Sequence, residues 1–347
     1  MATRVGATRF GALPDGSPVD LFTLTNAHGL VAKLTDYGAT LTELHVPDRS
    51  GRLADVVLGF DHLRQYLGDH HYFGSTVGRV ANRIGYGRFT LDGQVVQLAR
   101  NHGEHHLHGG PVGFDKALWQ SEVLHGAVRF THVSPDGDQG YPGRLEVAVT
   151  VTLTDDDALV FEYEATTDHP TPVNLTNHAW FNLAGAGDVL GHVLWLAATS
   201  YTPTDADLIP TGKILSVAGT PLDFSRPVAI GARIVELGGD PPGYDHNYVL
   251  GGAGRGLTVA ARLTEPVSGR VLEVATTEPG LQLYTGNHLD GTIDGKGGVI
   301  YPRYAGVCLE TQGFPDAVNH PGFPSVILRP GQTCRQTTAF RFSVEPD

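Results

Sequence analysis

Cysteine, methionine and basic residues are scarce in this chain of 347 residues. It contains two cysteines, Cys308 and Cys334, one methionine, and 24 lysines and arginines against 37 acidic residues, which gives a formal net charge of −13. Two cysteines without CxxC spacing do not make a disulfide framework or a cysteine-based zinc site, and they favour a reducing compartment. An acidic chain without a basic cluster is not expected to bind nucleic acid.

Long hydrophobic runs are also missing. Nowhere are 18 consecutive residues apolar, and the first twenty residues lack the hydrophobic segment of a signal peptide. We therefore expect a soluble, cytoplasmic protein with no membrane segment. Hydrophobic residues make up 41% of the chain and charged residues 18%, which is enough apolar material for a substantial core and too little charge for a disordered chain.

Glycine and proline, in contrast, are plentiful and evenly spread. The 45 glycines and 22 prolines are typical of many turns between short strands. From Leu145 to Leu153 apolar residues recur at every second position, and the run from Leu159 to Tyr163 continues this pattern after an acidic turn, so the two predict an antiparallel hairpin. A second hairpin is predicted at Asp92-Gly93, and only a brief helix, near residues 62–67. These patterns predict an all-β protein, built as a barrel or as a stack of sheets.

One acidic residue, Glu310, stands inside the apolar start of the stretch CLETQGFPDAVNHPGFP, which begins at Cys308. Burial disfavours a charged carboxylate and raises its pKa from about 4.3 toward neutrality, where a general base works at physiological pH. Glu310 is therefore a candidate base, although a strand residue in a surface ion pair would have the same sequence. Cys308 would share its strand face, but an apolar setting makes it a small core residue rather than a nucleophile.

Polar and apolar residues alternate in the stretch NLTNHAWFNLAG, from Asn174 to Gly185. Read as a strand, it places His178 and Trp180 on one face with amide side chains, and Ala179 and Phe181 on the other. A histidine on a strand is by default a hydrogen-bonded structural residue. Amides beside an aromatic ring, however, are the groups with which a pocket holds hydroxyls and an apolar ring surface.

Four further motifs lie between and before these stretches: GRVANRI with Asn82 and Arg83, HLHGG with His108, GYDHNYVL with Asp245, and LQLYTGNHLDG with Gln282. In this order, and together with the two stretches above, they resemble the aldose 1-epimerase (galactose mutarotase) family. The resemblance extends from the early strands to the last residues and so covers nearly the whole chain.

The resemblance implies one large twisted antiparallel β-sandwich domain spanning residues 1–347. It also implies an isomerase that interconverts the α and β anomers of free aldohexoses, such as D-glucose and D-galactose, by acid/base-catalysed ring opening and reclosure. Such an enzyme takes a monosaccharide as its small-molecule partner, needs no metal or other cofactor, and is a monomer or a homodimer. The implied catalytic residues are Glu310 as base, His178 as acid and His108 near the ring oxygen; the implied substrate-binding residues are Asn82, Arg83, Asp245, Gln282 and Trp180.

Taken alone, several of these residues have simpler interpretations. Arg83 could be a surface charge and Asp245 could cap a turn. The cluster NHGEHHLHGG suggests a metal, because His106 and His108 would share a strand face, but the acidic ligand expected a few residues later is missing. We expect His102, His105 and His106 to be loop residues without a metal.

Three other functions fit parts of the sequence. A glycoside hydrolase could use Glu310 and Asp245 as paired carboxyls, and a sugar-binding protein could use the same sandwich without catalysis. An epimerase of phosphorylated hexoses would need several arginines at the pocket, of which only Arg83 is clearly placed. Phosphate-binding loops and a GxSxG nucleophile motif are absent from the sequence.

Overall fold

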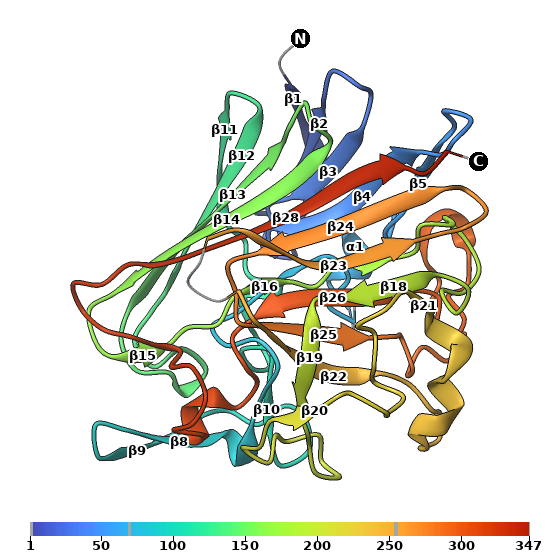
Figure 1. The fold of residues 1–347 in the computed structure, drawn as a ribbon. Helices are drawn as coiled ribbons and strands as arrows, with labels where there is room; N and C mark the ends of the chain where they lie inside the picture. Colours follow the sequence, from blue (N-terminus) through green and yellow to red (C-terminus); the bar gives the residue numbers. More distant parts are fainter. Residues whose placement is uncertain (1–2, 69–70, 253–255, 347) are drawn as a thin grey trace.

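The computed structural model describes residues 3–68, 71–252 and 256–346, and strands dominate these ranges (Figure 1). The one α-helix described, α1 (Leu63–Tyr66), lies where a brief helix is predicted. None of the described helices has both the length and the apolar composition that a bilayer crossing requires. The remaining helical elements are single 3-10 turns: η1 (Gly85–Gly87), η2 (Phe114–Lys116), η3 (Asp138–Gly140), η4 (Ile230–Ala232), η5 (Ile234–Leu237), η6 (Lys296–Gly298) and η7 (Ala317–Asn319).

Three large antiparallel sheets form the body of the molecule. The first has five strands, in the order β1 (Arg4–Ala12), β2 (Pro18–Thr25), β3 (Val31–Thr35), β4 (Thr40–Pro47) and β5 (Leu53–Asp55). The second has nine, in the order β11 (Gln120–Leu124), β12 (Ala127–Ser134), β13 (Leu145–Leu153), β14 (Ala158–Thr167), β28 (Cys334–Val344), β24 (Arg270–Thr276), β23 (Thr258–Thr264), β18 (Val193–Leu196) and β21 (Val228–Ala229). The third has six, in the order β17 (Trp180–Phe181), β26 (Val307–Gln312), β25 (Gly280–Tyr284), β22 (Asp245–Leu250), β19 (Ala198–Thr202) and β20 (Leu215–Ser216).

Four short two-stranded ladders complete the fold and carry much of the loop structure around it. They are β6 (Thr76–Val77) with β16 (Thr176–Asn177), β7 (Arg83–Ile84) with β10 (His106–Leu107), β8 (Arg88–Leu91) with β9 (Gln94–Gln97), and β15 (Thr171–Pro172) with β27 (Ile327–Leu328). The predicted all-β fold is confirmed.

Both predicted hairpins are present. Strands β13 and β14 pair in the register Leu145↔Thr167 to Leu153↔Leu159, so the alternating apolar residues of the two strands share one face. At the tip of the β8–β9 hairpin, Asp92 and Gly93 have φ angles of 48° and 80°, the positive values that a two-residue turn of this type requires. Local sequence pattern is sufficient to specify these two units.

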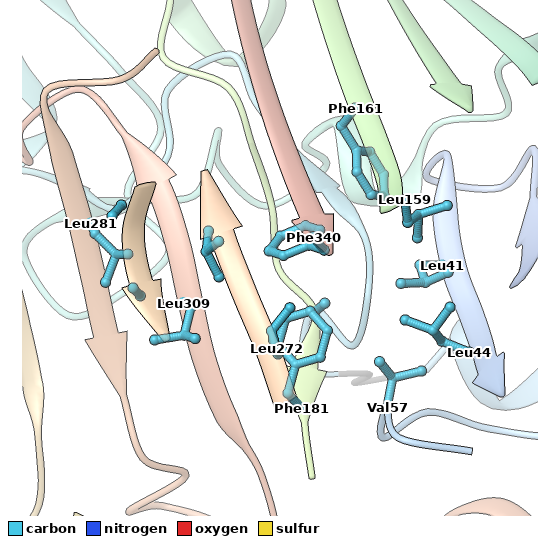
Figure 2. Close-up of a cluster of buried hydrophobic side chains, with 14 of the residues drawn as sticks. Leu41, Leu44, Val57, Leu159, Phe161, Phe181, Leu272, Leu281, Leu309 and Phe340 are labelled. Carbon is cyan, nitrogen blue, oxygen red and sulfur yellow. The ribbon is translucent and has the colours of Figure 1, made fainter. Parts of the chain in front are cut away.

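A single large hydrophobic cluster joins the three sheets. Leu41 and Leu44 of β4 lie beside Phe340 of β28 and Phe181 of β17, although these residues are up to 299 positions apart in the sequence (Figure 2). Figure 2 also shows Leu309 of β26 in this layer. Each fully buried side chain of this size contributes about 1.5–3 kcal/mol to stability, so this shared core is what holds the six-stranded sheet against the other two.

The stretch from Asn174 to Asn182 is not one continuous strand, as its alternation suggested. It forms two short pieces: β16 pairs with β6, and β17 pairs with β26 of the six-stranded sheet. The predicted apolar face is nevertheless present: Leu175, Ala179 and Phe181 all lie in the core. Between the two pieces, the backbone of His178 bonds to Ser75 and Gly74. The chain therefore leaves the β6–β16 ladder and joins the six-stranded sheet at His178.

Candidate active site

The outer face of the six-stranded sheet carries a row of polar side chains. Leu281, Leu283 and Leu309 point into the core, and the alternation of the strands therefore turns Gln282 and Glu310 to the opposite face. These two residues are direct cross-strand partners in β25 and β26. Strand pairing alone thus places a carboxyl and an amide side by side.

Pairing of β17 with β26 brings the histidine segment to this row. Trp180 lies opposite Cys308, and two residues further along in antiparallel register His178 reaches Glu310. The distance from His178 Nε2 to Glu310 Oε2 is 3.7 Å. The exposed fractions of the two residues are 5% and 2%, so an imidazole and a carboxyl from distant parts of the chain meet in a largely dry setting.

A second ladder, between β7 and β10, adds the next two residues. The His108 backbone N–H donates to the Asn82 carbonyl, and the Asn82 N–H donates to His108 Nδ1, at 3.0 and 3.1 Å. Both residues have left-handed backbone, with φ of 60° for Asn82 and 50° for His108. This conformation is uncommon for residues other than glycine, although asparagine and histidine adopt it more often than most, and such conformations are concentrated at functional sites.

These segments surround a cavity of about 220 Å³. Of the eight residues named from the sequence, seven line it, and Gln282 does not. The full lining is His71, Tyr72, Asn82, Arg83, His102, Leu107, His108, His178, Trp180, Asp245, Tyr284, His288 and Glu310.

Glu310 is the most strongly perturbed acid of the cavity. The pKa of its carboxyl is raised to about 8, mainly by burial and in smaller part by the nearby Asp245 charge, while Arg83 opposes the rise. Among the described residues, Glu310 Oε2 has no hydrogen-bond partner. A carboxyl that titrates near neutrality and has one oxygen available is suited to exchange a proton with a ligand.

His108 is held as a neutral hydrogen-bond donor. Burial lowers the pKa of its imidazole well below the usual range, and the neighbouring His178 and Arg83 lower it further. Because Nδ1 accepts the Asn82 N–H, the hydrogen of the neutral ring must be on Nε2. His108, His178 and Glu310 offer ligand atoms within 4.8 Å of one another, but in this tautomer neither nitrogen of His108 has a free lone pair for a metal. The donor set therefore does not fit a metal ion.

Asp245 and Arg83 form an ionic pair at the cavity wall, with Arg83 Nη2 3.8 Å from Asp245 Oδ2. Gln282 also contacts this carboxylate: its Nε2 donates a hydrogen bond to Asp245 Oδ1 at 2.6 Å. The expected contact of Gln282 with a sugar hydroxyl stays a prediction: Gln282 does not line the main cavity, but it lines a second, smaller pocket whose wall also includes Asn82, Arg83 and Asp245.

The sequence predicts that His102, His105 and His106 are loop residues, and this is wrong for His106. His106 lies in β10, fully buried, and bonds Ala99 O through Nδ1 and Tyr141 Oη through Nε2. It does not share a face with His108 because the left-handed backbone of His108 turns that ring to the cavity. His102 also reaches the cavity.

Sequence reasoning missed several wall residues, among them Tyr72, Tyr284 and His288. A signal for Tyr284 was available: it stands two positions after Gln282 in LQLY and so shares its strand face. No periodic signal marks Tyr72 or His288, because both lie outside the strands.

A carboxyl titrating near neutrality, an imidazole beside it and a ring of fixed donors and acceptors define the class of enzymes that move protons on a small polar molecule without a metal. Comparison with known proteins identifies the family to which the chain belongs.

The aldose 1-epimerase family profile matches residues 20–341. Galactose mutarotase from Bos taurus is 51% identical to this chain over 345 residues, which cover 98% of this chain and 99% of that protein. Aldose 1-epimerase from Escherichia coli K12 is 41% identical over 340 residues, covering 96% and 97%. A crystal structure of an aldose epimerase homologue from C. elegans superposes with a TM-score of 0.87 at 35% identity, covering 93% of this chain and 98% of that one. The chain belongs to the aldose 1-epimerase family.

Proposed function

We propose that this protein is an aldose 1-epimerase (mutarotase) that interconverts the α and β anomers of free aldohexoses such as D-glucose and D-galactose. The observation that carries the proposal is the 3.7 Å approach of His178 Nε2 to Glu310 Oε2 at a cavity lined by further polar side chains. Anomer exchange needs one group to take a proton from the C1 hydroxyl and another to give a proton to the ring oxygen, and this pair supplies both.

In the proposed mechanism, the Glu310 carboxylate takes the proton of the C1 hydroxyl. The electrons of that O–H bond form the C1 carbonyl, the bond between C1 and the ring oxygen breaks, and the ring oxygen takes a proton from His178 Nε2. Rotation about C1–C2 exposes the other carbonyl face, and the reverse transfers close the ring. Each positioned transfer contributes roughly a hundred- to ten-thousand-fold in rate. Neutral His108 donates a hydrogen bond near the ring oxygen.

The remaining residues hold the sugar. Arg83 donates hydrogen bonds from its guanidinium N–H groups to substrate oxygens, and Asp245 accepts hydrogen bonds from substrate hydroxyls. Asn82 contributes its amide, and Trp180 an apolar ring surface. Gln282 offers its amide as a further contact for a sugar hydroxyl, and the same amide donates to Asp245 Oδ1.

We also propose that all 347 residues form one domain, because one large core cluster has members from Phe22 to Phe342. Both cysteines are free, which fits a cytoplasmic location. We expect a monomer or homodimer with no nucleic-acid or membrane partner.

Polarimetry on freshly dissolved α-D-glucose and α-D-galactose tests the function. The optical rotation of at least one sugar should relax faster with the protein than in buffer alone. Release of reducing ends from a disaccharide, without faster relaxation, would show a glycoside hydrolase. Binding of either sugar without any rate effect would show a non-catalytic binding protein.

A charge change at Asp245 should move the pH profile. Its carboxylate raises the pKa of Glu310 and Arg83 lowers it, so Asp245→Asn removes the raising charge and leaves Arg83 unneutralised. The pKa of Glu310 then falls, and the acidic limb of kcat/KM, measured from pH 5 to 9, shifts to lower pH while KM rises.

Asp207→Asn is the matched control for this shift. Asp207 is an exposed carboxylate 3.7 Å from His105 Nε2 and outside the cavity lining, so its removal should leave the acidic limb of kcat/KM in place. If the acidic limb of kcat/KM in Asp245→Asn stayed in place or shifted to higher pH, Asp245 would not raise the pKa of Glu310.

A further inference from the structure

The imidazole of His178 is packed against several aromatic rings. Trp180 and Tyr72 each stack on it at a centroid distance of 5.8 Å and an interplanar angle of 21°. His108 meets it edge-on at 5.2 Å. A ring held in this way cannot tilt freely, so the partners of its two nitrogens are set by the surrounding structure.

Those two nitrogens face different residues of one strand. Nε2 approaches Glu310 Oε2, and Nδ1 lies 3.5 Å from Cys308 Sγ, a hydrogen-bonding distance for sulfur. Cys308 and Glu310 are two positions apart in β26 and therefore share its outer face. The ring thus lies between a thiol on one side and a carboxyl on the other.

The thiol remains protonated and unreactive. Cys308 is fully buried, and burial, followed by the charges of Glu310 and Asp245, raises the pKa of its thiol well above the usual range. A neutral thiol is a weak donor and a weak acceptor. When the imidazole is doubly protonated both of its nitrogens donate, so the sulfur can then only accept.

The direction of this contact matters for the proton exchange. For His178 to give a proton through Nε2 and take it back on ring closure, Nδ1 must keep its hydrogen while the ring is neutral. A sulfur that donated to Nδ1 would favour the opposite tautomer, with the hydrogen on Nε2, and block the return step.

We propose that Cys308 is a positioning residue for catalysis, whose sulfur accepts the Nδ1–H of His178 so that Nε2 is the nitrogen that exchanges protons with the sugar. This inference rests on the proposed function of His178. A carboxylate at this place would fix the same tautomer but would hold the imidazolium proton tightly. The weaker sulfur acceptor orients the ring and leaves the acid able to release its proton.

Three variants separate this role from simple packing. Cys308→Ala removes the acceptor, and kcat should fall on the order of tenfold with KM nearly unchanged. Cys308→Ser restores an acceptor, and kcat should return to within about threefold of the native value. If Cys308 serves only as a small hydrophobic residue, the order reverses, because a hydroxyl in an apolar site is worse than a methyl group. Cys334→Ala, at the half-buried cysteine of β28 outside the cavity, is the matched control and should keep the native kcat.

The tautomer can be read directly in the unmodified protein by ¹⁵N NMR of labelled histidines, with His178→Asn used to assign the signal. The other ionisable groups that the described residues place in the cavity wall stay the same across the cysteine variants: Glu310, His108, Tyr72, Tyr284, Asp245, Arg83, His71, His102 and His288. At a pH where His178 is neutral, we expect its hydrogen on Nδ1, and a shift toward Nε2–H in Cys308→Ala.

Two results would overturn the inference: an Nε2–H tautomer in the unmodified protein, or a Cys308→Ala variant at least as active as Cys308→Ser. Absence of mutarotase activity in the unmodified protein would instead refute the proposed function, and the tautomer measurement would still stand.

Discussion

Replacement of Glu310 by glutamine is expected to lower kcat at least a hundredfold and at the same time to stabilise the fold at neutral pH. The loss of rate follows because glutamine cannot take the proton of the C1 hydroxyl. The gain in stability follows because the buried carboxyl is costly to ionise: its pKa is about 8 in the native protein against 4.5 as the ordinary value.

The sign of the stability effect depends on pH. Below about pH 4.5 the carboxyl is protonated in both the folded and unfolded states and costs nothing. As the pH rises toward 8, the unfolded chain loses this proton while the native protein retains it, so the native protein loses stability relative to the unfolded chain. Removal of the ionisable group should therefore raise the free energy of unfolding by about 3 kcal/mol at pH 7, and by less than about 1 kcal/mol at pH 5.

Denaturant unfolding at pH 5, 7 and 8, combined with polarimetric kcat, measures both effects. Glu278→Gln is the matched control: burial raises the pKa of Glu278 to about 7, but it does not line the active-site cavity. It should show a similar, smaller pH-dependent stabilisation and retain activity. Retained activity in Glu310→Gln, or a stability difference that shrinks as the pH rises, would contradict the role or the electrostatics of Glu310.

Replacement of His178 by asparagine is expected to lower kcat by about a hundred- to ten-thousand-fold, with a much smaller change in KM. Asparagine retains a hydrogen-bonding amide but cannot deliver a proton to the ring oxygen. Because Arg83, Asp245 and Asn82 remain in the wall, the sugar still binds. Polarimetry measures kcat and KM of the variant, and circular dichroism establishes that it is folded. Together they show whether the loss lies in kcat and not in KM.

His106→Asn provides the comparison for this experiment. His106 is an equally buried histidine that bonds Tyr141 Oη and Ala99 O away from the cavity. Its loss should reduce stability by about 1–3 kcal/mol and leave kcat per folded molecule near the native value. If His178→Asn kept most of its activity, another group would have to be the acid.

Much of the local structure could be predicted from residue patterns. The hairpin of β13 and β14 and the turn at Asp92-Gly93 follow from period-two alternation and turn chemistry, which act over a few neighbouring residues. The apolar residues around Glu310 in the sequence also indicated a carboxyl with a raised pKa, although a residue in a surface ion pair fitted the same pattern. Motif resemblance, in turn, named seven of the thirteen residues that line the cavity.

Non-local pairing decided what the sequence pattern left open. Gln282 stands on the expected face of β25, and the adjacent strand supplies a partner that the sequence does not reveal, the carboxylate of Asp245. His106 was expected in a loop, yet pairing of β10 with β7 buries it against Tyr141. Neither result can be read from local periodicity, because strand alternation says which face a side chain takes and not which neighbour it meets.

The sequence by itself therefore determined the all-β class, the hairpins, and the chemical character of the two key stretches, because these depend on short-range spacing and composition. Only the tertiary structure decided that His178 meets Glu310. That contact joins residues 132 positions apart through the register of β17 on β26, and the shared core beneath the sheets fixes that register. The same packing buries the Glu310 carboxyl and so gives an ordinary glutamate a pKa suited to proton transfer.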